Sequence, residues 1–215
     1  MFTSPVILII AFLFSLSIHE AAHAYAADRL GDPTARLSGR VTLNPLAHLD
    51  PVGTLLPLFL LFTGSPIIFG WGKPVPFDPF NLKNPRRDAA LISFAGPASN
   101  LVLATFLAIL IRLGPFFLGT NVFLMELFLV PVIALNIMWA LFNLIPIHPL
   151  DGGKVLIGLL PQDLAIKWDE VLNQYGLILL LLLIFPFFGA SGIILILSPL
   201  INLILNFLLP GTALF

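Results

Sequence analysis

Long apolar stretches with few charges constrain this chain more than any other feature of its sequence. A helix that crosses a bilayer needs about 20 apolar residues, and residues 5–27, 89–113 and 121–144 each supply such a run. Of the 215 residues, 59% are hydrophobic and 10% are charged, whereas about a quarter are charged in a soluble domain. These values exclude a soluble globular protein and predict a polytopic membrane protein.

The apolar runs predict an all-α polytopic membrane protein with about five to six transmembrane segments. Two of these segments lie within residues 175–209 and are expected to form a helical hairpin. Residues 51–70 are apolar but contain Pro57, Gly64 and Pro66, so we expect a re-entrant segment or short hairpin, with a full span as the alternative. Residues 38–45 alternate and include β-branched side chains, which favours a short β element.

Basic residues are concentrated in three loops. Residues 29–50, 71–88 and 154–174 hold nine of the ten Lys and Arg residues. Because cytoplasmic loops are enriched in Lys and Arg, we expect all three loops on the cytoplasmic face and the N-terminus outside. Segment 51–70 must then enter and leave the membrane on one face. A net charge of −1 gives no support for a nucleic-acid partner.

A short polar motif, His19-Glu20-Ala21-Ala22-His23, interrupts the first apolar run. Residues four apart share one face of a helix, so both imidazoles can reach one zinc ion at about 2.0–2.1 Å. Glu20 projects from the adjacent turn and can take a proton from water, as in metalloproteases with this motif. The alternative is a chance match whose polar groups face water at the helix end.

Asp151 is the main candidate for a third metal ligand, because a catalytic zinc usually has three protein ligands and one open position. It follows the span 121–144, whose direction returns it to the same membrane face as His23. Prolines and glycines flank it, and irregular backbone is tolerated at membrane depth only where protein or a cavity surrounds it. The alternative is an N-cap of a short helix.

Five further polar residues have several interpretations. The amides Asn143 and Asn100 could donate to a substrate or an oxyanion, and helix–helix hydrogen bonding is the alternative. His148 could approach the metal, although a supporting or interfacial role is favoured. For His48 we favour an interfacial or turn-capping role over ligation, and we expect Glu126 to be interfacial.

Three ordered motifs resemble the site-2 protease family of intramembrane zinc metalloproteases. They are His19-Glu20-Ala21-Ala22-His23, Ser93-Phe94-Ala95-Gly96-Pro97-Ala98-Ser99-Asn100, and Asn143-Leu144-Ile145-Pro146 through Leu150-Asp151-Gly152-Gly153. Leu43-Asn44-Pro45 and the loop Gly70-Trp71-Gly72-Lys73-Pro74-Val75-Pro76 are similar to the family's compact members. Together the motifs extend over about residues 5–160.

The resemblance implies one Zn²⁺ per chain, with His19, His23 and Asp151 as its ligands. It implies Glu20 as the general base and Asn143 as an active-site amide that helps to hold substrate or oxyanion. It also implies a three-helix catalytic core, and a strand or membrane-entering loop that could present an extended substrate by strand addition.

The length indicates a single membrane-embedded metalloprotease domain over residues 1–215. Its catalytic core is expected at about residues 5–160 and its C-terminal hairpin at about 175–209. The larger relatives carry a PDZ or CBS-type regulatory domain, and this chain has room for neither.

The expected function is regulated intramembrane proteolysis, in which peptide bonds of a transmembrane protein or peptide are hydrolysed within the lipid bilayer. We expect a prokaryotic plasma membrane, with the active site toward the cytoplasmic side. The alternative is a non-proteolytic zinc-binding membrane protein, such as a transporter or a partner-binding chaperone. The sequence predicts no particular oligomeric state.

Overall fold

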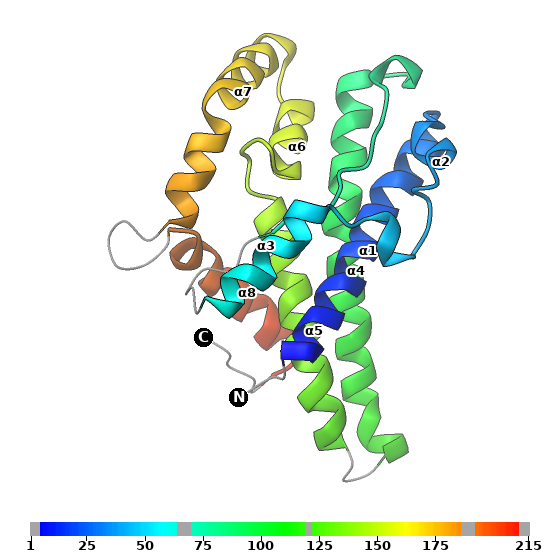
Figure 1. Cartoon of the computed structure of the whole chain (residues 1–215), viewed down its shortest axis with the longest axis vertical. Coiled ribbons are helices and arrows are strands. Elements are labelled where there is room, and N and C mark those ends of the chain that lie inside the picture. Colours follow the sequence, from blue (N-terminus) through cyan, green and yellow to red (C-terminus); the bar gives the residue numbers. More distant parts are fainter. Residues whose placement is uncertain (1–4, 64–69, 119–121, 186–191, 211–215) are drawn as a thin grey trace.

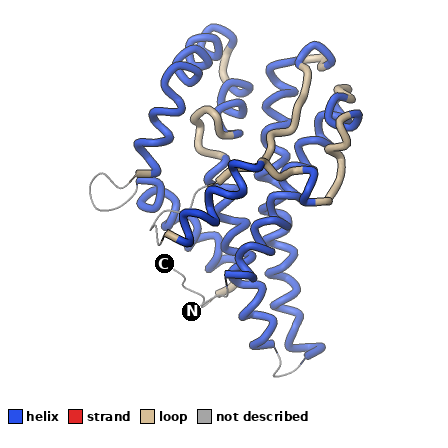
Figure 2. Tube along the Cα trace, viewed as in Figure 1, coloured by secondary structure: helices blue, strands red, loops and turns tan. Residues whose placement is uncertain are grey.

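A computed structural model describes residues 5–63, 70–118, 122–185 and 192–210, most of which are helical (Figure 2). The α-helices are α1 (Pro5–Leu30), α2 (Thr34–Leu37), α3 (Pro51–Phe62), α4 (Pro85–Leu118), α5 (Val122–Asn143), α6 (Asp151–Leu159), α7 (Gln162–Ile184) and α8 (Gly192–Leu208). Two short 3₁₀ helices are η1 (Pro45–Ala47) and η2 (Pro79–Asn81).

Three of the described helices are long and apolar enough to cross a membrane, namely Ile9–Leu30 of α1, Pro85–Phe116 of α4 and Met125–Asn143 of α5. A backbone in lipid must satisfy its hydrogen bonds internally, which favours such unbroken helices. They lie side by side (Figure 1) and confirm a helical integral membrane protein. The expected total of five to six transmembrane segments stays a prediction.

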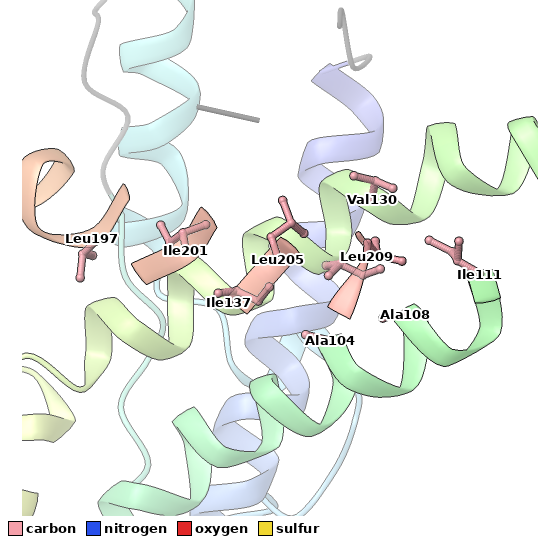
Figure 3. Packing of buried hydrophobic residues seen from close by; sticks show 10 residues of the cluster. Ala104, Ala108, Ile111, Val130, Ile137, Leu197, Ile201, Leu205 and Leu209 are labelled. Carbon is pink, nitrogen blue, oxygen red and sulfur yellow. The ribbon is translucent and has the colours of Figure 1, made fainter. Parts of the chain in front are cut away.

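Helix α8 packs into a core between α4 and α5 (Figure 3). Leu197, Ile201 and Leu205, four residues apart, form its buried face. Opposite them, Ala104 and Ala108 of α4 present small side chains, which let membrane helices approach closely. The helices α7 and α8 cover the region of the expected C-terminal hairpin, and α7 begins earlier than expected.

Parts of all three basic loops lie at one end of the molecule. The C-terminal end of α1, the N-terminal end of α4 and the turn between α6 and α7 are together at the top of Figure 1. The connection from α4 to α5 is at the opposite end. This arrangement agrees with one shared membrane face for the loops, while the cytoplasmic identity of that face stays a prediction.

The expected short strand at residues 38–45 is wrong. Gly39 has a φ of 68° after α2. The backbone N–H of Arg40 donates to the carbonyl of Ala35, and that of Thr42 donates to the carbonyl of Arg40, both within local turns. Asn44 then caps η1 by accepting from the N–H of Leu46. Local turns therefore use the groups that a strand would need, and the described residues contain one isolated bridge, between Leu49 and Gly72.

That bridge brings together the two ends of segment 51–70. The N–H of Lys73 also donates to the carbonyl of His48 at 2.8 Å. Within the segment, α3 has 12 residues and rises about 18 Å, less than the hydrocarbon core of about 30 Å. Residues 64–69 lie outside the described part of the chain. The neighbouring ends of segment 51–70 are consistent with a segment that enters and leaves the membrane on one face. This re-entrant path stays a prediction.

Candidate metal centre

Three potential ligand atoms converge from two helices. Nε2 of His19 and Nε2 of His23, both on α1, are 3.0 Å apart, and each lies 3.2 Å from Oδ2 of Asp151. Two atoms bound at about 2.0–2.1 Å to a tetrahedral zinc are about 3.3 Å apart. His19 and His23 are buried and Asp151, the first residue of α6, is half-buried. The donor types and their spacing therefore fit zinc.

The second nitrogen of each imidazole is occupied by a hydrogen bond. Nδ1 of His23 is 2.7 Å from the carbonyl oxygen of Ile92, and Nδ1 of His19 is 2.6 Å from Oδ1 of Asn100. A carbonyl oxygen only accepts, so both Nδ1 atoms donate, and a ring in its neutral form presents its Nε2 lone pair toward the other two ligand atoms. A cation bound between the three atoms would interact favourably with all of them.

Gly96 of α4 leaves room for the two rings. A Cβ atom at this position would lie 2.4 Å from Nε2 of His23 and 2.7 Å from Cε1 of His19. The backbone of α4 therefore forms one wall of the metal centre, and a side chain there would displace the candidate ligands.

Glu20 and Asn143 line the same cavity as the three candidate ligands. Glu20 is 9% exposed, and its Oε2 is 4.0 Å from Nη2 of the buried Arg40. Nδ2 of Asn143 donates to the carbonyl of Trp139 one turn earlier, at 3.0 Å. An amide NH₂ has two N–H groups, so a second donor is left for another group.

The cavity has a volume of about 560 Å³. The candidate ligands are part of its lining, and α5, α7 and α8 contribute apolar walls that include Phe142, Leu180 and Leu197. Gly70, Trp71, Gly72, Pro74 and Val75 form a further wall, and within this non-helical segment Gly72 makes the isolated bridge with Leu49. The cavity is therefore lined mainly by apolar side chains, with the candidate ligands among its polar groups.

Three other candidate residues do not join the cluster. Nε2 of His148 lies 3.3 Å from Oδ1 of Asp169 on α7. His48 is fully buried, and its Nε2 donates to the carbonyl of Thr42 at 2.8 Å, so it ties a turn together. Glu126 is exposed on α5.

Sequence reasoning missed two buried residues near the centre. Asn136 of α5 is fully buried and hydrogen-bonds with Asn100 at 2.8 Å. Arg40 is 4% exposed and joins two loops beside Glu20. Asn136 could have been found as a single amide in the middle of an apolar span. No feature of the neighbouring sequence indicates that Arg40 is buried.

Comparison with known proteins gives one family and several relatives. The description "Peptidase family M50" belongs to a family model that matches residues 7–123 and 120–183. "Putative zinc metalloprotease YwhC" of Bacillus subtilis is 39% identical over 204 residues, which cover 91% of this chain and 85% of that protein. "Putative zinc metalloprotease Rip2" of Mycolicibacterium smegmatis is 34% identical over 200 residues, with 84% and 68% covered. No solved structure matches the chain.

Proposed function

Since the chain belongs to peptidase family M50, the site-2 protease family, we propose that it is an intramembrane zinc metalloprotease acting on transmembrane protein substrates. The observation that carries the proposal is the convergence of three ligand atoms from His19, His23 and Asp151 within 3.2 Å of one another. His19 and His23 lie on a helix long enough to span a membrane, and Asp151 begins α6, shortly after the span in α5. Two bacterial relatives carry names that begin "Putative zinc metalloprotease".

Five polar residues of the cavity have roles in this proposal. His19, His23 and Asp151 would hold the ion and leave one position open. Zinc supplies Lewis-acid stabilisation of negative charge that develops on a substrate carbonyl. Glu20 accepts a proton from the attacking water and returns it to the leaving amine. Asn143 uses its second amide N–H to stabilise the oxyanion.

The walls of the cavity support a substrate in extended form. A helix shields its own carbonyls by hydrogen bonds, so the scissile peptide has to leave the helical conformation first. The segment 70–75, which already forms one antiparallel bridge through Gly72, contributes to the cavity lining and is the candidate to pair with such a strand. The apolar walls contributed by α5, α7 and α8 accept the side chains of a membrane segment.

Glu20→Gln tests this function directly. The variant should bind zinc like the wild type and cleave a model transmembrane substrate in detergent at least about 100-fold more slowly, because general acid–base catalysis contributes about 10²–10⁴-fold. Glu126→Gln is the matched control, because Glu126 is an exposed glutamate on α5. This variant should keep full activity.

Two results would contradict the proposal. Cleavage by Glu20→Gln at the wild-type rate would remove the glutamate from the reaction. A zinc-loaded wild type that cleaves nothing in a panel of transmembrane substrates would favour the non-proteolytic alternative.

A further inference from the structure

A chain of buried hydrogen bonds connects α5 to the candidate ligand His19 through α4. Its members are Asn136 of α5, Asn100 of α4 and Ser15 of α1, which are 0%, 0% and 1% exposed. None of these three side chains lines the cavity or belongs to the candidate ligand cluster. Their contacts determine where the proton on His19 is placed.

The orientation of the Asn136 amide is set by a backbone carbonyl. Nδ2 of Asn136 lies 2.8 Å from the carbonyl oxygen of Val132 and 2.8 Å from Oγ of Ser15. Because a carbonyl oxygen can only accept, the NH₂ group of Asn136 must face it. Oδ1 of Asn136 therefore points to Asn100, whose Nδ2 donates to it at 2.8 Å.

The orientation of the Asn100 amide follows from these contacts. Its Nδ2 faces two atoms that act as acceptors, Oδ1 of Asn136 at 2.8 Å and the carbonyl oxygen of Ser15 at 3.3 Å. Its Oδ1 therefore faces Nδ1 of His19 at 2.6 Å. Since an amide oxygen only accepts, Nδ1 of His19 carries the proton and Nε2 presents its lone pair toward His23 and Asp151.

We infer that Asn136 and Ser15 act as positioning residues for the metal centre, because they fix the amide of Asn100 and thereby the tautomer and ring orientation of His19. The inference rests on the proposed function. Reversal of either amide would set oxygen against oxygen in a buried site, where an unmade hydrogen bond is costly. Partners that orient a ligating histidine typically change metal affinity about 10–100-fold when they are removed.

Zinc affinity measured by chelator competition in detergent tests the inference without reference to proteolysis. Asn100→Ala should weaken zinc binding about 10–100-fold, and Asn136→Ala should weaken it in the same direction by a smaller factor. Ser17→Ala is the matched control, because Ser17 is equally buried on α1 and its hydroxyl donates to the carbonyl of Leu13 in its own helix. This variant should keep wild-type affinity.

The double variant Asn100→Ala/Asn136→Ala separates positioning from simple packing between helices. If Asn136 acts through Asn100, its removal should cause no further loss of zinc affinity once Asn100 is gone. The thermal stability of the zinc-free protein should still fall when Asn136 is removed, because its packing contacts are lost in either background. Additive losses of zinc affinity would overturn the inference.

Two further variants keep the outcomes separable. Ser15→Ala removes one hydroxyl and provides a milder change if Asn136→Ala does not fold. This variant should lower zinc affinity measurably. Unchanged zinc affinity would overturn the positioning role of Ser15. His19→Ala should abolish zinc binding. Unaltered zinc binding by His19→Ala would contradict the proposed function itself. If His19→Ala loses zinc binding while Asn100→Ala and Asn136→Ala keep wild-type affinity, only the inference is overturned.

Discussion

Gly96 and Asp32 show how much individual residues determine in this protein. Gly96 lies in the middle of a transmembrane helix, where alanine would favour the helical backbone by about 0.5–1 kcal/mol. A Cβ at this position would, however, lie within 2.7 Å of both candidate histidine ligands. Glycine is therefore required here because a side chain would occupy the space of the two imidazole rings. The backbone at this position is helical and does not need the conformational freedom of glycine.

Gly96→Ala should consequently keep the helical fold and lose most of its bound zinc. The added methyl group must displace the ring of His23 or His19, which separates the three ligand atoms. Zinc content by mass spectrometry, with far-UV circular dichroism for folding, checks the prediction. Gly192→Ala is a suitable control because its nearest neighbour, a flexible side-chain atom of Leu183, lies at 3.3 Å. Full zinc content in Gly96→Ala would contradict the prediction.

Asp32 is a buried carboxylate that joins two loops outside the membrane-spanning helices. Its Oδ1 accepts from the hydroxyl of Thr34 and from Nδ2 of Asn81 at 2.8 Å, and its Oδ2 accepts from the N–H of Asp78 at 2.7 Å. Burial raises the pKa of Asp32, but these hydrogen bonds outweigh it and hold the pKa below its ordinary value of 3.8.

A depressed pKa in the folded state gives a defined pH dependence. The stabilisation is complete above the pKa of the unfolded chain and is lost as the pH falls through the lower, folded value. The wild type should therefore lose stability below about pH 4, and Asp32→Asn should be less stable at neutral pH and less sensitive to acid. Thermal unfolding in detergent from pH 7 to pH 3 measures both effects.

Glu170→Gln, which alters an exposed carboxylate on α7, should behave like the wild type in these experiments. Identical pH profiles for the wild type and Asp32→Asn would show that Asp32 does not contribute to acid sensitivity.

At the scale of elements, Arg40 joins the loop after α2 to the segment 70–75 beside the cavity. Its Nη1 donates to the carbonyl of Pro74 at 3.2 Å, and its Nη2 donates to the carbonyl of Lys73. The guanidinium is 4% exposed, and Glu20 lies 4.0 Å away. One buried cation thus holds the segment that borders the substrate space and adjoins the proposed general base.

Arg40→Ala should reduce kcat/KM about tenfold or more, because a hydrogen bond to a charged group is worth about 1.5–3 kcal/mol. Arg40→Lys should recover only part of the loss, since an ammonium lacks the planar fork of the guanidinium. Zinc content should stay unchanged in both. Peptidase assays with a transmembrane substrate measure the effect.

Arg36→Ala is the control for this experiment. Arg36 forms an exposed ion pair with Asp28, and such pairs contribute about 0–1 kcal/mol, so activity should be unaffected. Equal activities for Arg40→Ala and Arg36→Ala would rule out the proposed role of Arg40.

At the scale of the whole molecule, basic helix ends lie together at one end. The basic ends of α1 and α4 lie together, opposite the connection between α4 and α5 (Figure 1). At 1.5 Å per residue, His23 and His19 lie about 9 and 15 Å along α1 from Arg29. The candidate metal centre is therefore below the basic surface and farther from the opposite one.

We expect the basic end to face the cytoplasm, because cytoplasmic loops are enriched in Lys and Arg. The chain has no cysteine, so single substitutions can be labelled without background. A membrane-impermeant maleimide applied to intact cells should label Glu126→Cys and should reach Lys83→Cys only after the membrane is opened. The reverse labelling pattern would show that the orientation is inverted.

Local features of the sequence determined the membrane class, the positions of the three long helices and the candidate ligands. The predicted spans 5–27, 89–113 and 121–144 fall within or close to α1, α4 and α5, because a helix in lipid satisfies its own backbone and hydrophobicity alone identifies it. The spacing of His19 and His23 requires only one helix, and the glycines and prolines around Asp151 marked it as exceptional.

The tertiary structure decided the features that depend on distant segments. The alternation at residues 38–45 suggested a strand, but a strand needs a partner, and local turns took its backbone groups instead. The roles of Asn136 and Arg40 depend on atoms contributed by residues 121 and 34 positions away in the chain. Hydrophobicity and helical spacing are local properties, whereas a hydrogen-bond network is defined only when the helices have packed together.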